Sequence, residues 1–197
     1  MALSPNHLQM ETTKTAYFNS REKWRDWLKE NFQTEKEIWL IYPNKSTGKQ
    51  RILYNDAVEE ALCFGWIDST MKKYDATHSM QRFTPRNPKS AYSQPNKERL
   101  KWLAENKMLH PEIHKNVAHV LTEEFVYPTD IITALQADEE TWRNFQAFSE
   151  SYKRIRVAYI QGARSRPDEF EKRLRNFLKK TKSNKKIIGH GGIDKYY

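Results

Sequence analysis

Apolar positions along the first 110 residues follow two periods, which predict strands and helices in alternation. Ile38–Tyr42 is a short, continuous apolar run, as expected of a buried strand. Helices are expected at about 20–31, after the N-cap Ser20, and at about 55–65, before a stop at Gly65. The same reading predicts further strands at 51–54, 66–74 and 80–84, and a helix from Ser90 or Ser93 to about Lys107.

From Pro111 onward the pattern is helical almost throughout. The clearest stripe is that of Phe170, Leu174, Phe177 and Leu178, which recur at the spacing of one helix face. Candidate helices lie at about 111–124, 129–137, 139–148, 151–163 and 167–181.

These patterns predict an α+β protein, with a small, mainly antiparallel sheet and packed helices followed by an all-helical C-terminal region. We expect the α+β domain to span 14–108 and the helical region to span 109–182. Residues 1–13 are expected to be flexible. Residues 183–197 lack apolar periodicity and are predicted to be a disordered basic tail, and residues 187–197 are expected to be dispensable for folding.

Charge is distributed unevenly between the two regions. The formal net charge is +9, and residues 151–186 hold 13 Lys and Arg against three Asp and Glu. Nucleic acid or an anionic surface is therefore a possible partner of the basic helices, although no standard recognition motif is present. Tyr152 and Tyr159 lie nearby in the sequence. The cations that could contact such a partner are Arg154, Arg156, Arg164, Arg166, Arg173, Arg175, Lys179 and Lys180.

Several other classes of protein are not indicated. No apolar run approaches the ~18 residues of a membrane helix, and residues 1–10 do not form a secretory signal. The single cysteine, Cys63, fits a reducing cytoplasm and is expected to be a buried structural thiol. Neither a metal nor a cofactor is predicted, because His110 and His114 lack the pattern of a zinc site.

The segment between Ala61 and Asn96 carries the candidate chemistry. Alternation places Trp66, Asp68, Thr70 and Lys72 on one strand face, with Trp66 largely buried. Asp68 could form an ion pair with Arg82 or Arg86, or these cations could hold an anion at the start of the following helix. The candidate ligand-binding residues are Trp66, Asp68, Lys72, Arg82, Arg86, Ser90, Tyr92, Ser93 and Asn96.

The same segment resembles a known family. Ala61–Asp68, Arg82–Arg86 and the residues Lys89, Ser90, Ser93, Asn96 and Arg99 are similar to the signature of the YdeI/OmpD-associated, or bacteriocin-protection, family. The similarity extends over about 14–182, and Ala158–Arg175 resembles the basic helical C-terminus of the family. The resemblance implies a stress or antimicrobial-peptide-resistance factor. The cations around the start of the helix at Ser90 or Ser93 further suggest that this factor binds a small anionic ligand.

Two alternatives remain from the sequence. The chain could be an enzyme of undefined reaction that uses an Asp68/Arg86 pocket, or a nonspecific binder of nucleic acid or anionic surfaces through its basic helices. The catalytic residues, the ligand and the oligomeric state are not determined by the sequence.

Overall fold

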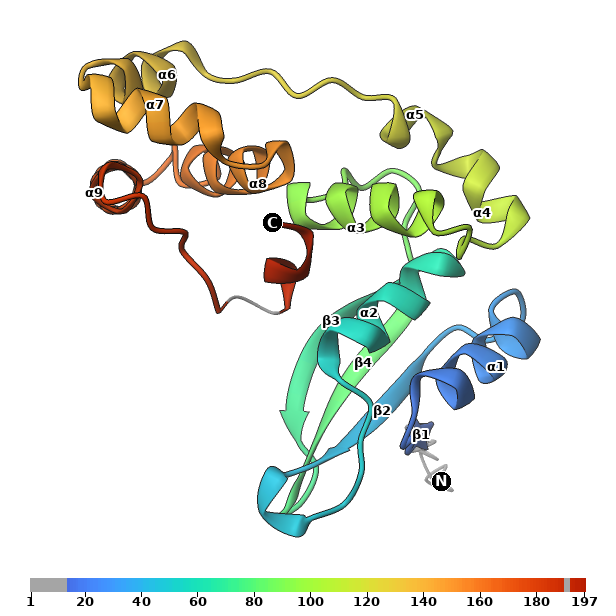
Figure 1. Ribbon diagram of the computed structural model, residues 1–197. Helices are drawn as coiled ribbons and strands as arrows, with labels where there is room; N and C mark the ends of the chain where they lie inside the picture. Colours follow the sequence, from blue (N-terminus) through green and yellow to red (C-terminus); the bar gives the residue numbers. More distant parts are fainter. Residues whose placement is uncertain (1–13, 190–191) are drawn as a thin grey trace, which may run out of the picture. The chain divides into compact units, whose positions relative to one another are not determined.

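The computed structural model describes residues 14–189 and 192–197 (Figure 1), so the segment 1–13 lies outside the described residues. Its contacts divide the chain into two compact units. The first unit comprises the described residues up to 61 and residues 65–86, and the second comprises 62–64 and the described residues from 87 onward. A sheet in the first unit and helices through the second confirm the α+β class.

The first unit is built on a four-stranded sheet with the strand order β1-β2-β4-β3. The strands are β1 (Thr15–Ala16), β2 (Ile38–Pro43), β3 (Trp66–Lys73) and β4 (His78–Pro85). β1 runs parallel to β2, whereas the β2–β4 and β3–β4 pairs are antiparallel. The sheet is therefore mainly antiparallel, as predicted. The strand expected at 51–54 is absent, because Tyr54 already begins a helix.

Register assigns the strand residues to two faces. Phe83 on β4 lies opposite Ile38 on one side and Asp68 on the other, and paired residues share a face. The register then shifts between Asp68 and Met71, so that Lys72 pairs with Met80. Asp68 and Lys72 consequently lie on opposite faces. The predicted shared face was wrong, because strict alternation does not hold across a bulge.

Two helices pack on the face that carries Phe83. Helix α1 (Arg21–Asn31) begins where predicted, with Ser20 Oγ accepting from the Lys23 N–H. The Trp24 ring lies 5.5 Å from that of Phe83, and Trp24 Nε1 donates to the carbonyl of Ala57 in helix α2 (Tyr54–Cys63) at 3.0 Å. A short 3₁₀ helix, η1 (Lys45–Thr47), lies between β2 and α2.

An ion-pair cluster joins α1 to α2. Glu59 and Glu60 are fully buried, and each accepts a hydrogen bond from Arg21. Arg25 donates to the second oxygen of Glu60 at 2.6 Å. Buried carboxylates are tolerated only when charges or dipoles replace the lost water. The register between the two helices therefore depends on these four side chains.

The second unit consists of helices, most of them connected by short turns, with longer connections between α5 and α6 and after α9 (Figure 1). Helix α3 belongs to this unit, because it packs against α8 and the 3₁₀ helix η2. Across its contact with α8, Arg154 donates to both oxygens of the buried Glu98, at 2.7 and 2.8 Å. The elements are α3 (Gln94–Glu105), α4 (Pro111–Asn116), α5 (Ala118–Leu121), α6 (Thr129–Gln136), α7 (Glu139–Ala147), α8 (Glu150–Gln161), α9 (Pro167–Lys182) and η2 (Ile193–Tyr196).

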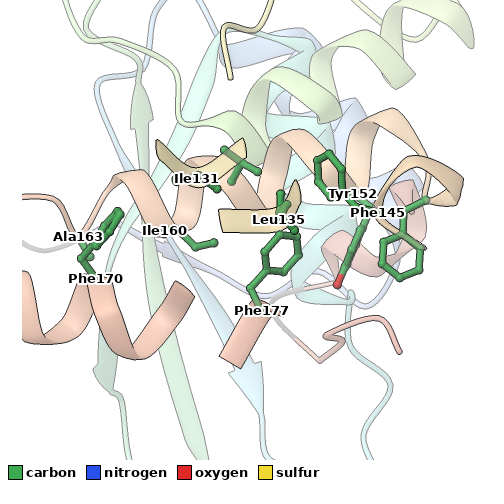
Figure 2. Close-up of a cluster of buried hydrophobic side chains, with 10 residues drawn as sticks. Ile131, Leu135, Phe145, Tyr152, Ile160, Ala163, Phe170 and Phe177 are labelled. Carbon is green, nitrogen blue, oxygen red and sulfur yellow. The ribbon is translucent and has the colours of Figure 1, made fainter. Parts of the chain in front are cut away.

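The core of the helical unit lies among α6–α9 (Figure 2). Phe145, Tyr152 and Phe177 contribute rings from three helices, and the Phe145 and Phe177 rings meet edge to face at 6.2 Å. Phe170 and Phe177 are buried, with Leu174 and Leu178 packed beside them. The apolar stripe predicted for this helix is therefore confirmed.

The last residues of the chain differ from the prediction. A disordered tail was expected over 183–197, yet η2 forms and buries Ile193 and Tyr196 against Ile155 and Trp102. Ser151 Oγ also donates to the Tyr196 carbonyl. Two apolar residues have no detectable period, which is why the pattern missed them.

Glu60→Ala is expected to lower the free energy of unfolding by about 3 kcal/mol, because it removes the buried carboxylate that accepts from both Arg21 and Arg25. The matched control is Glu37→Ala, which removes an ion pair at the surface. In that pair the Glu37 side chain is 36% exposed and the Arg82 side chain is 40% exposed. That pair should contribute less than about 1 kcal/mol. Urea unfolding measures both, and equal losses would contradict the role of the buried cluster.

Ile193→Ala is expected to destabilise the protein by about 2–4 kcal/mol, because it removes buried apolar volume. Ile188→Ala is the matched control, since Ile188 is 67% exposed and should lose almost nothing. Thermal unfolding followed by circular dichroism compares the two. A neutral Ile193→Ala would restore the view that the tail does not pack.

Candidate functional site

The candidate residues chosen from the sequence fall in different units. Trp66, Asp68, Lys72, Arg82 and Arg86 belong to the first unit, and Ser90, Tyr92, Ser93 and Asn96 belong to the second.

The side chain of Trp66 packs in the core of the first unit, and the side chain of Asp68 lies among polar groups. Trp66 is buried, its ring lies edge to face with that of Trp27, and its Nε1 donates to the Phe32 carbonyl at 3.0 Å. Asp68 Oδ2 accepts from Tyr54 Oη at 2.9 Å and from Gln81 Nε2 at 2.7 Å. Neutral donors therefore take the place that the sequence prediction gave to an arginine.

Arg82 lies on the opposite face of the sheet, where its partner is Glu37. Arg82 Nε donates to Glu37 Oε2 at 2.8 Å, and this bond lowers the pKa of the Glu37 carboxyl. The Lys72 ammonium lies 4.8 Å from the centre of the Trp39 ring on the same face. An Asp68–Arg82 pair is excluded because adjacent strand positions point to opposite faces.

The remaining candidates lie around the chain that leads into α3. The Arg86 N–H donates to the Gly65 carbonyl at 2.9 Å, and the Ser90 N–H donates to the Asn87 carbonyl at 3.0 Å. Ser93 is the N-cap of α3, but its side chain makes no capping hydrogen bond. Asn96 Oδ1 accepts from Arg99, and Tyr92 is half-buried. Anion binding at this helix start stays a prediction.

A buried polar cluster that the sequence analysis did not foresee surrounds Asp68. Gln81 and Tyr42 are only 3% and 5% exposed. Neither Gln81 Oε1 nor Tyr42 Oη has a hydrogen-bond partner among the described residues. Burial, with the nearby Asp68 charge, raises the pKa of Tyr42 well above its usual value, so its hydroxyl stays protonated.

A cavity of about 250 Å³ lies between α8 and α9 in the second unit. Its lining combines a charged group of residues with an apolar floor, which the side chains of the helical core supply. The lining residues are Arg156, Tyr159, Ile160, Glu169, Lys172, Arg173, Asn176, Phe177 and Ile187.

Arg156 is the unusual member of this lining. Its side chain comes from the buried face of α8 and the residue is only 3% exposed. One terminal nitrogen donates to the Ile187 carbonyl and to the Tyr197 hydroxyl. Arg156 Nε, however, has no acceptor among the described residues. A buried guanidinium N–H without an acceptor is costly, so an anion in the cavity would relieve it.

The other charged residues of the cavity come from α9. Arg173 donates to Glu169 at 2.7 Å and to the Tyr159 carbonyl at 2.7 Å, and its guanidinium lies over the Tyr159 ring at 3.8 Å. The bond from Arg173 lowers the pKa of the Glu169 carboxyl. Lys172 is exposed and makes no hydrogen bond within the described part of the chain. Three cations thus face one carboxylate.

Sequence reasoning found part of this site. It named Arg156, Arg173 and Tyr159 as possible nucleic-acid contacts but not as members of one cavity, and it missed Lys172 and Glu169. A signal was present at Arg156, because Tyr152, Arg156 and Ile160 follow one another at steps of four. That spacing puts the arginine on the buried stripe of its helix.

Cys63 is a buried thiol, as predicted. No group of three His, Cys, Asp or Glu side chains is arranged to hold a metal ion within 14–189 and 192–197. Over the same residues, every helix is too short or too polar to span a bilayer.

Two family models match different parts of the chain. Residues 16–116 match a domain of unknown function, DUF8412. Since this match covers just over half of the sequence, the chain belongs to that family. Residues 124–184, which contain the cavity-forming helices, match the family described as Bacteriocin-protection, YdeI or OmpD-Associated.

These matches confirm the resemblance to the YdeI/OmpD-associated family for 124–184. The signature residues of that resemblance, within 61–99, fall instead within the DUF8412 match, whereas Ala158–Arg175 lies within the 124–184 match. No curated protein and no solved structure matches the chain.

Tyr42→Phe is expected to leave the free energy of unfolding unchanged or to raise it by up to about 1 kcal/mol, because the lost hydroxyl is buried and has no partner among the described residues. Tyr54→Phe is the matched control. It removes the donor to Asp68 and should cost about 0.5–1.5 kcal/mol. Urea unfolding of both variants tests this. A larger loss at Tyr42 would reveal a bound partner, such as an ordered water.

Proposed function

We propose that the protein binds a small anionic ligand in the cavity between α8 and α9. The observation that carries the proposal is the buried Arg156 guanidinium, whose Nε has no acceptor within the described chain. A negatively charged oxygen in the cavity would supply that acceptor through a charge-assisted hydrogen bond. Water could also fill the position, but it would leave the buried positive charge uncompensated.

The rest of the lining supports an anion rather than a cation or a neutral ligand. Lys172 and Arg173 add two positive charges, whereas Glu169 is the single carboxylate and already accepts from Arg173. The apolar floor formed by Ile160 and Phe177 lowers the local polarity and strengthens charge interactions in the cavity.

This site replaces the helix start near Ser93 as the preferred position for the ligand. It also gives the basic helices a role that needs no nucleic acid. A part in bacteriocin protection rests on the description of the family that matches residues 124–184, and we propose it on that ground. The single buried cysteine supports a cytoplasmic location.

Thermal unfolding in the presence of inorganic phosphate tests the proposal, with sodium chloride added to hold ionic strength constant. An anion that binds only the folded chain adds about 2.7 kcal/mol of stability at 100 times its Kd. Lys172→Ala should bind phosphate about tenfold more weakly, because it removes one cation from the cavity. Lys180→Ala is the control, since Lys180 lies on the same helix outside the lining.

Arg156→Lys tests the central group directly, because lysine keeps the charge but lacks the Nε donor and the planar fork. We expect this variant to lose most of the stabilisation by phosphate. Equal stabilisation of the wild-type chain, Lys172→Ala and Lys180→Ala would refute the site, even if Arg156→Lys failed to fold.

A further inference from the structure

We infer that the ligand is a small phosphate monoester whose carbon body is apolar. This inference rests on the proposed function, because it specifies the chemistry of the anion that the same cavity would hold. It follows from the charge, the floor and the volume of the cavity, each of which restricts a different part of the ligand.

Charge determines the head group. Arg156, Lys172 and Arg173 line the cavity with Glu169 as their only acidic neighbour in the lining, which leaves an excess of two positive charges. A carboxylate or a sulfonate would neutralise one of them. A phosphate monoester carries about −1.5 to −2 charges at pH 7 and offers three acceptor oxygens, so it matches the excess.

The distribution of the cations agrees with a terminal phosphate. Arg156 is buried, whereas Lys172 is exposed on α9. A head group with several oxygens can accept from the buried Nε and from an ammonium at the rim together. A carboxylate holds both of its oxygens in one plane, whereas the three terminal oxygens of a phosphate point in three directions.

The floor and the volume determine the body. Ile160, Phe177 and Ile187 line the cavity with apolar surface. A hydrated inorganic ion would leave this surface in contact with water, whereas an apolar group on the ligand would cover it. The volume of about 250 Å³ is slightly below the ~300 Å³ at which sites for drug-sized ligands begin. One ring or a short alkyl chain is therefore the expected body.

Isothermal titration with phenyl phosphate, benzenesulfonate and inorganic phosphate tests the inference on the full chain. At pH 7.5, phenyl phosphate should bind about tenfold more tightly than either of the other two. Its affinity should fall about tenfold between pH 7.5 and pH 5, because the second phosphate pKa is about 6. Benzenesulfonate keeps one charge throughout and should show no such change.

Protonation of the protein should not imitate this result. Among the described residues, the charged and titratable groups that line the cavity or contact Arg156 are Tyr159, Glu169, Lys172, Arg173, Tyr152 and Tyr197, with no histidine. Any titration of the protein would affect benzenesulfonate as well, so the sulfonate serves as the internal control.

A pair of variants tests the body of the ligand separately. Ile187→Ala removes apolar lining but keeps the backbone carbonyl that Arg156 contacts, so it should weaken phenyl phosphate several-fold and inorganic phosphate very little. Ile188→Ala, at an exposed neighbouring position, should change neither.

The outcomes separate the two levels of the proposal. Benzenesulfonate binding as tightly as phenyl phosphate at pH 7.5 would overturn the dianionic head, and inorganic phosphate binding as tightly would overturn the apolar body. In both cases anion binding itself would stand. Vesicles containing phosphatidic acid that bind more tightly than phenyl phosphate would overturn a free small molecule. If none of the anions binds, the proposed function fails.

Discussion

Burial of charge is the constraint on which both units depend. A charged side chain can leave water only where opposite charges or fixed dipoles replace it. Glu59 and Glu60 meet this requirement through Arg21 and Arg25, and Glu98 meets it through Nε and Nη2 of Arg154. Each of these contacts joins two helices, so charge compensation and helix placement are one problem. Arg156 meets the requirement only in part, which is why it marks the cavity.

Sequence periodicity was informative wherever a helix has one buried and one solvated side. Helix α1 with its Ser20 cap and the stripe of α9 follow from that rule, as does the apolar run of β2. It failed where polar residues are buried. The two glutamates of α2 look like solvent positions to any hydropathy pattern, because their stabilising partners are about 35 to 39 residues away in sequence.

The candidate site shows the same limit in a different form. A single register shift after Asp68 exchanges the faces of all later residues of β3, and no feature of the sequence predicts where such a shift falls. Arg156 could have been recognised by its position in a buried stripe. The unpaired state of its Nε among the described residues could not have been predicted from the sequence. It depends on which donors of Arg156 are taken by the Ile187 carbonyl and the Tyr197 hydroxyl, which come from a distant part of the chain.

The place of β3 at the edge of the described sheet has a consequence for the behaviour of the protein in a crowded solution. An edge strand offers unpaired backbone groups to any extended chain, which favours aggregation. Here the bulge interrupts the regular ladder, and Lys72 and Lys73 put two charges at the exposed end of the strand. Both features oppose strand-to-strand association between copies, so part of this strand is shaped by solubility rather than by any ligand.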